Sequence, residues 1–503
     1  MNQFFKRSVP FLASLSLVLG GCQPDLNDDP KSSAGEADFS RYIAVGNSLT
    51  AGYGDSGLYL EGQQTSYPNI MSQQFARVGG GSFAQPLFPT ANAAGTGYLK
   101  IAGFSGPNPA ITSEDGSFTA ATATTPAVVV NGTPTTRFAA GRAFVSPTLP
   151  LLLRYSATDN QNLGVPGIRV ADITTADYGR LTASSNAGNF NPLFERLLPN
   201  AADSRTYLAY IQERVTTVKP TFFTNWLGNN DVLGYATNGG TAVPLTTVAE
   251  FTTKYNQSVD ALTADGAKGL VATIPTVTAV PFFTTVPTAA VAAQINATPI
   301  PAALEPSIRA ALGLPAGAPL PAGLRFGFYI TTGAGVKRLA TPADLLVLPA
   351  RSFINTPSTP AQLFPQGLGL EIPGAPAPTA AALANASNAL ANSLVLDAAE
   401  VTAVNDRTNE LNAVITASAQ RKNLALFDAN AFFNGIARNG IVVNGVNNTA
   451  AFISGNLFSL DGVHPTPRGY AVIANEMIKT INAKYGASVP GVDASTYRGV
   501  RFP

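Results

Sequence analysis

A short segment near the C-terminus carries two side chains that could transfer protons. Residues 459–470 read SLDGVHPTPRGY and contain His464, the only histidine among 503 residues. Asp461 precedes this histidine by three positions. A neutral imidazole can accept a proton from a hydroxyl group near pH 7, and a carboxylate on its second nitrogen fixes the tautomer. The segment therefore predicts a histidine base oriented by Asp461, although a histidine held by a local turn would give the same pattern.

The composition disfavours a metal centre. A usual zinc site needs several nitrogen and sulfur ligands, whereas this chain has one histidine and one cysteine. Carboxylates could hold calcium or magnesium, but no acidic loop has the spacing of such a site. We therefore expect neither a metal nor another cofactor.

A histidine base needs a nucleophile, and Ser48 is the candidate. Residues 43–55 read IAVGNSLTAGYGD, so Ser48 follows a short apolar run by two positions, and Gly46 permits a sharp turn between them. Open parallel sheets place their sites at the carboxyl ends of strands. A serine in such a turn can also serve only as a helix cap.

Two further segments could stabilise negative charge on a reacting oxygen. Residues 225–231, NWLGNND, place Asn230 just after another apolar run, and an asparagine amide can donate to an oxyanion. Residues 162–170, NLGVPGIRV, contain Gly167. Its backbone N–H can approach a ligand closely because glycine has no side chain.

The motifs GNSL, NLGVPG, GNND and DGVHP, in this order, resemble the SGNH or GDSL-type serine hydrolases, a family of esterases and lipases. The resemblance implies that Ser48 is the nucleophile, that His464 is the general base and acid, and that Asp461 orients His464. It also implies an oxyanion hole made by the backbone N–H groups of Ser48 and Gly167 and the side chain of Asn230. The implied reaction is acyl transfer through an acyl-enzyme, followed by hydrolysis.

One position departs from the family pattern, which usually has aspartate where this chain has Asn47. The exchange removes a negative charge beside the nucleophile and adds an NH₂ donor. Because this position carries no proton in the implied mechanism, we expect altered local hydrogen bonding and retained activity. The GxSxG motif of the other large esterase fold does not occur around Ser48.

The elements that must position these residues are strands alternating with helices. Four short apolar runs, each typical of a strand buried on both faces, lie at residues 41–46, 221–228, 269–275 and 424–429. Such alternation predicts an α/β fold with a central parallel sheet. The resemblance implies the three-layer α/β/α sandwich of the SGNH hydrolases, which is flavodoxin-like, here with two long insertions.

Two helices have clear end signals. Asp397 and Glu400 have the spacing of a capping box, and Arg421 and Lys422 close the same helical pattern. The last helix is expected to start with Thr466 as its cap and Pro467 at its first position. Its inner face carries an apolar row, and Gly486 can end it. The residues expected in that row are Tyr470, Ile473, Met477 and Ile481.

Two stretches interrupt the strand–helix pattern. Residues 78–158 are rich in Gly, Pro, Thr and Ala, and residues 285–395 are rich in Ala and Pro. Their apolar content favours packed insertions that wall or cover a site, although disorder is an alternative. Asn-Gly and Asn-Gly-Val signals predict hairpins at 128–133 and 442–448.

The N-terminus has the layout of a lipoprotein signal. Residues 1–21 combine Lys6 and Arg7 with an apolar run too short to span a bilayer, and the run ends at Cys22. This arrangement resembles a bacterial lipoprotein processing box, in which the cysteine is acylated. We therefore expect a signal peptide at 1–21, a lipidated flexible tether at 22–39, a hydrolase domain at 40–486 and a C-terminal tail at 487–503.

The charge balance narrows the expected partners. Loss of Lys6 and Arg7 with the signal would change the formal charge from +1 to −1, so there is no basic excess to bind nucleic acid. The expected partners are an ester substrate (an acylated glycan, a lipid or a small ester) and a membrane, through lipid on Cys22. The expected place is the bacterial cell envelope, at the outer membrane, on either its periplasmic face or the cell surface.

The sequence leaves three functions open. The first is a lipid-anchored esterase that hydrolyses carboxylic esters. The second is an acyltransferase, which uses the same acyl-enzyme with a sugar or an alcohol in place of water. The third is a noncatalytic surface lipoprotein that binds glycans or proteins.

Overall fold

The four predicted strands form one parallel sheet. In this computed structural model they are β1 (Tyr42–Gly46), β6 (Phe222–Trp226), β7 (Lys268–Ala272) and β13 (Ala425–Phe427), in the order β1-β6-β7-β13. Every residue of β1 and β6 is buried, as expected for strands covered on both faces. The prediction of an α/β fold with a central parallel sheet is confirmed.

The structure describes residues 32–105, 108–116, 118–119, 151–155, 157–180, 190–357 and 362–503. The predicted signal peptide, Cys22, most of the tether and the predicted hairpin at 128–133 lie outside these ranges. Within them, no helix is both long enough and apolar enough to cross a bilayer.

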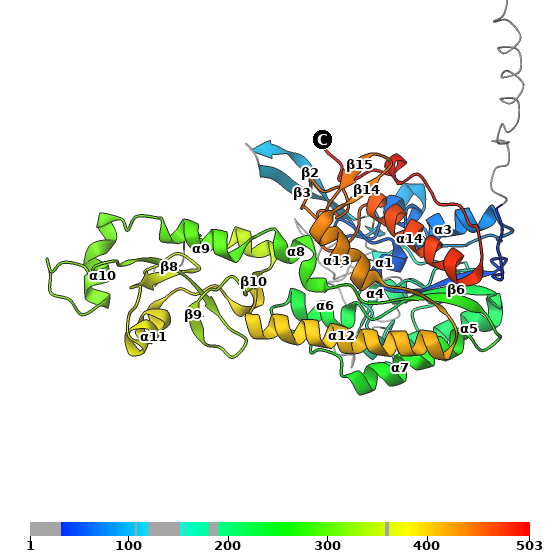
Figure 1. Cartoon of the computed structure of the whole chain (residues 1–503), viewed down its shortest axis with the longest axis horizontal. Coiled ribbons are helices and arrows are strands. Elements are labelled where there is room, and N and C mark those ends of the chain that lie inside the picture. The colour runs from blue at the N-terminus through cyan, green and yellow to red at the C-terminus, as the bar shows by residue number, and fades with distance from the viewer. Residues whose placement is uncertain are drawn as a thin grey trace, which may run out of the picture.

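Helices cover both faces of the sheet (Figure 1). One layer consists of α5 (Tyr207–Val218), α7 (Val248–Leu262) and α12 (Ala398–Arg421), in which α7 packs against both α5 and α12. The other layer contains α3 (Tyr67–Ala76) and α14 (Pro467–Tyr485), with α14 also packed against β13. The three layers match the expected sandwich.

The predicted helix ends are confirmed. The Asp397 side chain accepts hydrogen bonds from the N–H groups of Ala399 and Glu400, and the Glu400 carboxylate accepts from the Asp397 N–H, which completes a capping box. Thr466 caps α14, and Gly486 ends it in the left-handed conformation. The four residues expected on the inner face of α14 are all buried.

Short elements surround the sheet. The second predicted hairpin is confirmed as β14 (Ile441–Val443) and β15 (Val446–Asn448), with Asn444 and Gly445 at positive φ in the turn. The other elements of the body are α1 (Ser48–Ala51), α2 (Leu60–Gln64), α4 (Pro192–Glu195), α6 (Asn230–Thr237), α8 (Pro281–Thr284), α13 (Ala429–Asn439), β2 (Tyr98–Ser105), β3 (Asn108–Glu114), β4 (Phe118–Thr119) and β5 (Leu151–Leu152).

Residues 285–395 fold into a lobe that projects from the body (Figure 1). Its three-stranded antiparallel sheet has the order β11-β8-β9, and Phe326, Phe328 and Ile330 of β8 are buried. The expectation of a packed insertion is confirmed for the described part of this stretch. The lobe comprises α9 (Thr288–Asn296), α10 (Glu305–Ala311), β8 (Arg325–Thr331), β9 (Lys337–Leu339), β10 (Leu345–Leu346), β11 (Leu368–Glu371), α11 (Ala377–Ala386) and β12 (Val395–Leu396).

Both expected domain boundaries need correction. Phe39, assigned to a flexible tether, is buried, and its ring stacks on Phe75 with centroids 4.1 Å apart. At the other end, Val489, Ala494 and Val500 of the expected tail are buried. Apolar side chains of both segments are buried against the body, which is favourable because it removes apolar surface from water. The folded body therefore extends beyond residues 40–486.

Candidate active site

Ser48 lies directly after the first strand of the sheet. β1 ends at Gly46, and Ser48 is the first residue of α1, with 6% of its surface exposed. A Cβ atom at Gly46 would lie 2.0 Å from Thr50 Oγ1 and 3.2 Å from the Trp226 carbonyl oxygen. The turn therefore requires glycine for lack of space. The first N–H groups of a helix have no partner within the helix, so the Ser48 N–H is available to a ligand.

Asn47 caps this short helix. Its Oδ1 accepts a hydrogen bond from the Leu49 N–H at 3.0 Å, and the residue is fully buried. Its Nδ2 has no hydrogen-bond partner among the described residues. The aspartate usual in the resembled family would carry no such donor, so the exchange leaves both N–H groups of the buried amide without a partner among the described residues.

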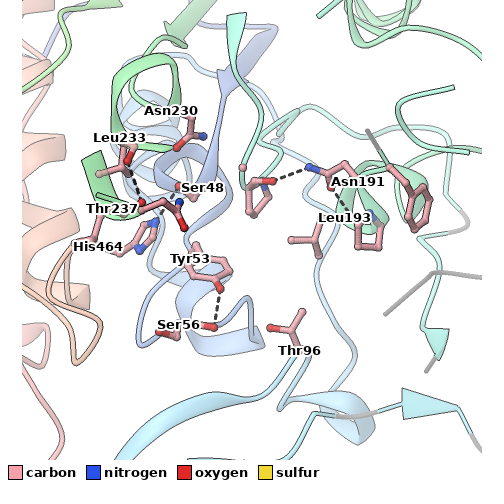
Figure 2. A pocket seen from close by; sticks show the side chains of 16 residues that line it. Ser48, Tyr53, Ser56, Thr96, Asn191, Leu193, Asn230, Leu233, Thr237 and His464 are labelled. Carbon is pink, nitrogen blue, oxygen red and sulfur yellow. Dashed lines mark hydrogen bonds between the residues drawn. The ribbon is translucent and has the colours of Figure 1, made fainter. Parts of the chain in front are cut away.

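His464 joins Ser48 to Asp461. His464 Nε2 lies 2.9 Å from Ser48 Oγ, and Nδ1 lies 2.9 Å from Asp461 Oδ2 (Figure 2 shows the Ser48 contact). An ionised carboxylate can only accept hydrogen bonds, so Nδ1 carries the proton in the neutral ring and Nε2 is free to accept from the Ser48 hydroxyl. The structure thus brings together the three side chains that the sequence had placed in one mechanism.

Asp461 is held in its ionised form. Burial acts to raise its pKa, but the neighbouring His464, together with the N–H groups of His464 and Ser56, outweighs burial and lowers the pKa of Asp461 to about 2. Its Oδ1 accepts from the N–H groups of Val463 and His464, both at 2.8 Å. Its Oδ2 accepts from the Ser56 N–H at 2.8 Å. These bonds fix the carboxylate against the imidazole.

A segment beside β1 brings Gly167 near the nucleophile. Residues 161–165 extend the sheet past β1, because the N–H groups of Leu163 and Val165 donate to the carbonyl oxygens of Ala44 and Gly46. Gly167 follows with φ of 84°, a conformation that favours glycine. Among the described residues, a Cβ atom there would meet only Asn191 Nδ2, at 3.7 Å. Conformation, more than lack of space, therefore favours glycine at this position.

Asn230 starts α6, at the end of β6. Its Nδ2 donates one hydrogen bond to the Ile168 carbonyl oxygen at 2.9 Å, which leaves the second N–H of the amide for a ligand. Asp231 ties the same two segments together, since its carboxylate accepts from the N–H groups of Val170 and Ala171 at 2.7 and 3.1 Å. Asn230 and Gly167 therefore belong to one hydrogen-bonded unit.

These groups border one cavity of about 550 Å³, the Ser48 cavity (Figure 2). Ser48, His464, Gly167 and Asn230 line it. Apolar walls come from Tyr53, Leu193, Leu233 and Val463. An adjoining cavity of about 300 Å³ shares Gly167 and Asn230 and is bordered by the ion pair of Arg169 and Asp172, whose Nη2 and Oδ1 lie 2.6 Å apart.

The expectation that residues 285–395 wall the site was wrong. No residue of this lobe is among the described residues that line the Ser48 cavity, and the lobe extends away from the sheet (Figure 1). Thr96, from the expected insertion at 78–158, does line it. Among the described residues, no group of three or more His, Cys, Asp or Glu side chains could hold a metal ion.

Two residues that follow Ser48 in the chain make contacts in the site that the sequence did not predict. The Tyr53 ring lies 4.7 Å from the His464 ring, centroid to centroid, and the Ser56 N–H binds Asp461. Tyr53 lies in the segment GYGD (residues 52–55) next to the serine motif, and Ser56 directly follows this segment. Nothing in their spacing indicates that they meet a loop some 400 residues later.

A comparison with protein families gives one match for part of the chain. Residues 344–477 match the GDSL-like lipases and acylhydrolases. The matched range includes Asp461 and His464 but not Ser48, and it supports a hydrolase.

Comparisons with individual proteins add little. No curated protein matches this chain. Among solved structures, the chain is similar to LAE5, described as an alpha/beta hydrolase enzyme from the metagenome of Lake Arreo, Spain. The identity is 12% over 89% of this chain and 97% of that chain, with a TM-score of 0.33, which is too low to indicate a shared arrangement of elements.

Proposed function

We propose that the protein is a serine esterase that hydrolyses carboxylic esters with Ser48 as nucleophile. The observation that carries the proposal is the chain of contacts from Ser48 Oγ through both nitrogens of His464 to Asp461, each at 2.9 Å. A nucleophile within hydrogen-bonding distance of a base, which is itself oriented by a third group, is the arrangement that activates a serine hydroxyl.

In the proposed reaction, Ser48 Oγ attacks the ester carbonyl carbon and His464 Nε2 takes the hydroxyl proton. Asp461 stabilises the resulting imidazolium. The negative charge on the carbonyl oxygen is stabilised by the N–H groups of Ser48 and Gly167 and by the Asn230 amide. His464 then protonates the departing alcohol, and a water molecule repeats the sequence on the acyl-enzyme.

The direct test is the substitution Ser48→Ala. We expect it to abolish hydrolysis of p-nitrophenyl acetate and labelling by a fluorophosphonate probe, because both require the Ser48 oxygen. Circular dichroism and the thermal midpoint should match the parent chain. Full hydrolysis by the folded variant would remove Ser48 from the mechanism. A panel of esters graded in acyl length, extended to acylated sugars, would then define the substrate.

The proposal includes a lipid anchor on Cys22. It is supported by the basic and apolar residues before this cysteine and by the polar, acidic stretch after it. The parent chain, expressed in a bacterial host, should incorporate labelled palmitate and fractionate with the outer membrane, whereas Cys22→Ala should incorporate none. Palmitate incorporation by Cys22→Ala would disprove the anchor at this position.

A further inference from the structure

A tight turn beside the Ser48 cavity has a conformation that its residues disfavour. Gly54 and Gly57 exchange two backbone hydrogen bonds, at 2.9 and 3.0 Å. The two residues between them have φ of 51° for Asp55 and 59° for Ser56. Two-residue hairpin turns of this kind favour Asn-Gly or Gly-Gly, because L side chains resist positive φ. The surrounding structure must therefore hold this turn in place.

The turn delivers one N–H group to the proposed proton relay. The Ser56 N–H donates to Asp461 Oδ2 at 2.8 Å, and this oxygen is also the one that accepts from His464 Nδ1. The Ser56 carbonyl oxygen accepts from the Tyr53 hydroxyl at 2.6 Å, while the Tyr53 ring packs against His464. The position of the turn therefore affects both the carboxylate and the imidazole.

Asp55 connects the turn to the loop that carries Asp461. Its carboxylate accepts from the Leu460 N–H and from the Tyr59 hydroxyl, both at 2.9 Å, and its own N–H donates to Ser459 Oγ at 2.9 Å. Leu460 directly precedes Asp461. Asp55 is only 7% exposed, so these donors replace the water that its carboxylate has lost.

Arg498, close to the C-terminus, completes this network. Its guanidinium binds both carboxylate oxygens of Glu61, at 2.7 and 2.8 Å, and Nη2 also donates to the Tyr59 hydroxyl at 3.1 Å. The same Nη2 lies 4.0 Å from Asp55 Oδ2. The C-terminal segment thus supplies the cation that faces the buried Asp55.

We propose that Asp55 and Arg498 are positioning residues, and that through them the C-terminal segment holds the Asp55–Ser56 turn against Asp461. The inference rests on the proposed function. Neither residue lines the Ser48 cavity, so both act through the orientation of Asp461 and His464. Loss of either should reduce turnover and leave substrate binding nearly unchanged.

The test compares two arginines that contact the same carboxylate. Arg501 approaches Glu61 at 3.3 Å, but its side chain is 60% exposed, and Arg498 alone of the two donates to Tyr59 among the described residues. In the full chain with p-nitrophenyl acetate, we expect Arg498→Ala to lower kcat about tenfold or more and to change KM less than about twofold. Arg501→Ala should leave both values within about twofold.

A pair of Asp55 variants provides the second measurement. Asp55→Asn keeps an acceptor for the Leu460 N–H, and asparagine tolerates positive φ, whereas Asp55→Ala leaves that N–H unpaired. We expect kcat to fall in the order parent, Asp55→Asn, Asp55→Ala. Each kcat is expressed per site titrated with the fluorophosphonate and measured well below the thermal midpoint, so unfolded protein does not contribute.

The outcomes separate this inference from the proposed function. A parent chain that neither hydrolyses the ester nor labels at Ser48 removes both. An active parent whose Arg498→Ala and Arg501→Ala variants have equal kcat removes the positioning inference only. If Arg498→Ala does not fold, the variants Asp55→Asn and Asp55→Ala test the inference instead. Equal kcat per titrated site in these two variants and in the parent would show that the network has a purely structural role.

Discussion

At the scale of single residues, the proposed chemistry depends on side chains whose orientation is fixed by hydrogen bonds to neighbouring groups. One carboxylate oxygen of Asp461 contacts the His464 ring, while the other accepts hydrogen bonds from two backbone N–H groups. Asn230 donates one of its two amide N–H groups to the Ile168 carbonyl oxygen. Groups fixed in this way need little reorganisation when charge develops on a substrate. The site therefore combines a few reacting atoms with many hydrogen bonds that orient them.

Asn230→Ala tests the proposed oxyanion donor. Removal of the amide should lower kcat by roughly 10²–10³, the usual effect of losing one such donor. Asn439→Ala, at the exposed end of α13, is the control and should have no effect. An Asn230→Ala variant with the kcat of the parent would exclude this side chain from the hole.

Asp231 should make the stability depend on pH. Burial raises its pKa to about 6 from 3.8, although the Val170 N–H, the Thr246 hydroxyl and the Ala171 N–H oppose the shift. Between these values the folded state binds a proton that the unfolded state has released. The free energy of unfolding of the parent, relative to Asp231→Asn, should therefore fall by up to about 3 kcal/mol as the pH rises from 4 to above 6.

Urea unfolding at pH 4, 5, 6 and 7 would measure this difference. The comparison with Asp231→Asn removes the contribution of other buried carboxylates to the pH dependence of the free energy of unfolding. Asp55 is one of them, because burial also raises its pKa. A difference between the two proteins that stays constant from pH 4 to pH 7 would contradict the raised pKa of Asp231.

At the scale of elements, the site forms where neighbouring strands end. β1 and β6 are adjacent and parallel, so the residues that follow them, Ser48 and Asn230, emerge at the same edge of the sheet. The segment at 161–165 lies on the other side of β1 and leads to Gly167. Three short connections thus place three groups around one cavity without any long loop.

Gly46→Ala tests the connection after β1. The added methyl group would lie 2.0 Å from Thr50 Oγ1, so the turn must shift, at a cost of about 1–3 kcal/mol in the free energy of unfolding. Because Ser48 lies two positions further on, kcat per titrated site should fall as well. Urea unfolding and ester hydrolysis measure the two effects.

Gly435→Ala is the matched control for this substitution. Gly435 lies within α13, where an added Cβ atom meets no atom of the described residues within 4 Å. Alanine there should stabilise the helix by about 0.5–1 kcal/mol and leave kcat unchanged. Equal behaviour of the two variants would show that Gly46 is not needed for space.

At the scale of the whole molecule, distant parts of the chain meet at the loop that carries His464. The lobe of residues 285–395 extends away from the site (Figure 1), yet Leu348 at its base lies near Gly462, where a Cβ atom would be 3.3 Å from Leu348 Cδ2. The same Cβ atom would be 2.9 Å from the nitrogen of Phe282 in α8, the body helix that precedes the lobe. The C-terminal segment approaches from another direction through Arg498. Leu348 of the lobe and Phe282 of α8 thus lie close to the loop that carries Asp461 and His464, although no described residue of the lobe lines the cavity.

Comparison of Gly462→Ala with Gly445→Ala separates the backbone strain of a positive φ from steric crowding of the added Cβ atom. Both glycines have positive φ, 71° and 79°, but a Cβ atom at Gly445 would have no neighbour within 4 Å in the part of the chain that the structure describes. Gly445→Ala should cost about 1–2 kcal/mol in the free energy of unfolding and leave kcat unchanged. Gly462→Ala should cost more and should lower kcat, because it pushes the loop away from α8. Equal losses in both measurements would contradict a role for this contact.

Short-range sequence patterns were enough to predict the strands of the sheet and the ends of two helices. The four apolar runs became the four strands of the sheet, and the caps at Asp397 and Thr466 start the helices that the sequence predicted. These features depend on residues within a few positions of one another, whose preferences act before the chain is compact. The tertiary structure brings together the residues of the four motifs around one cavity, as the resemblance implied.

Only the tertiary structure decided which distant groups support that site. Ser56 and Asp461 are 405 positions apart, and Arg498 reaches Glu61 across 437 positions. The lobe was expected beside the cavity and lies elsewhere, and the tail was expected outside the domain and packs into it. Such contacts follow from how all the elements pack at once, so composition and short-range spacing at Asp55 or Arg498 carry no signal of them.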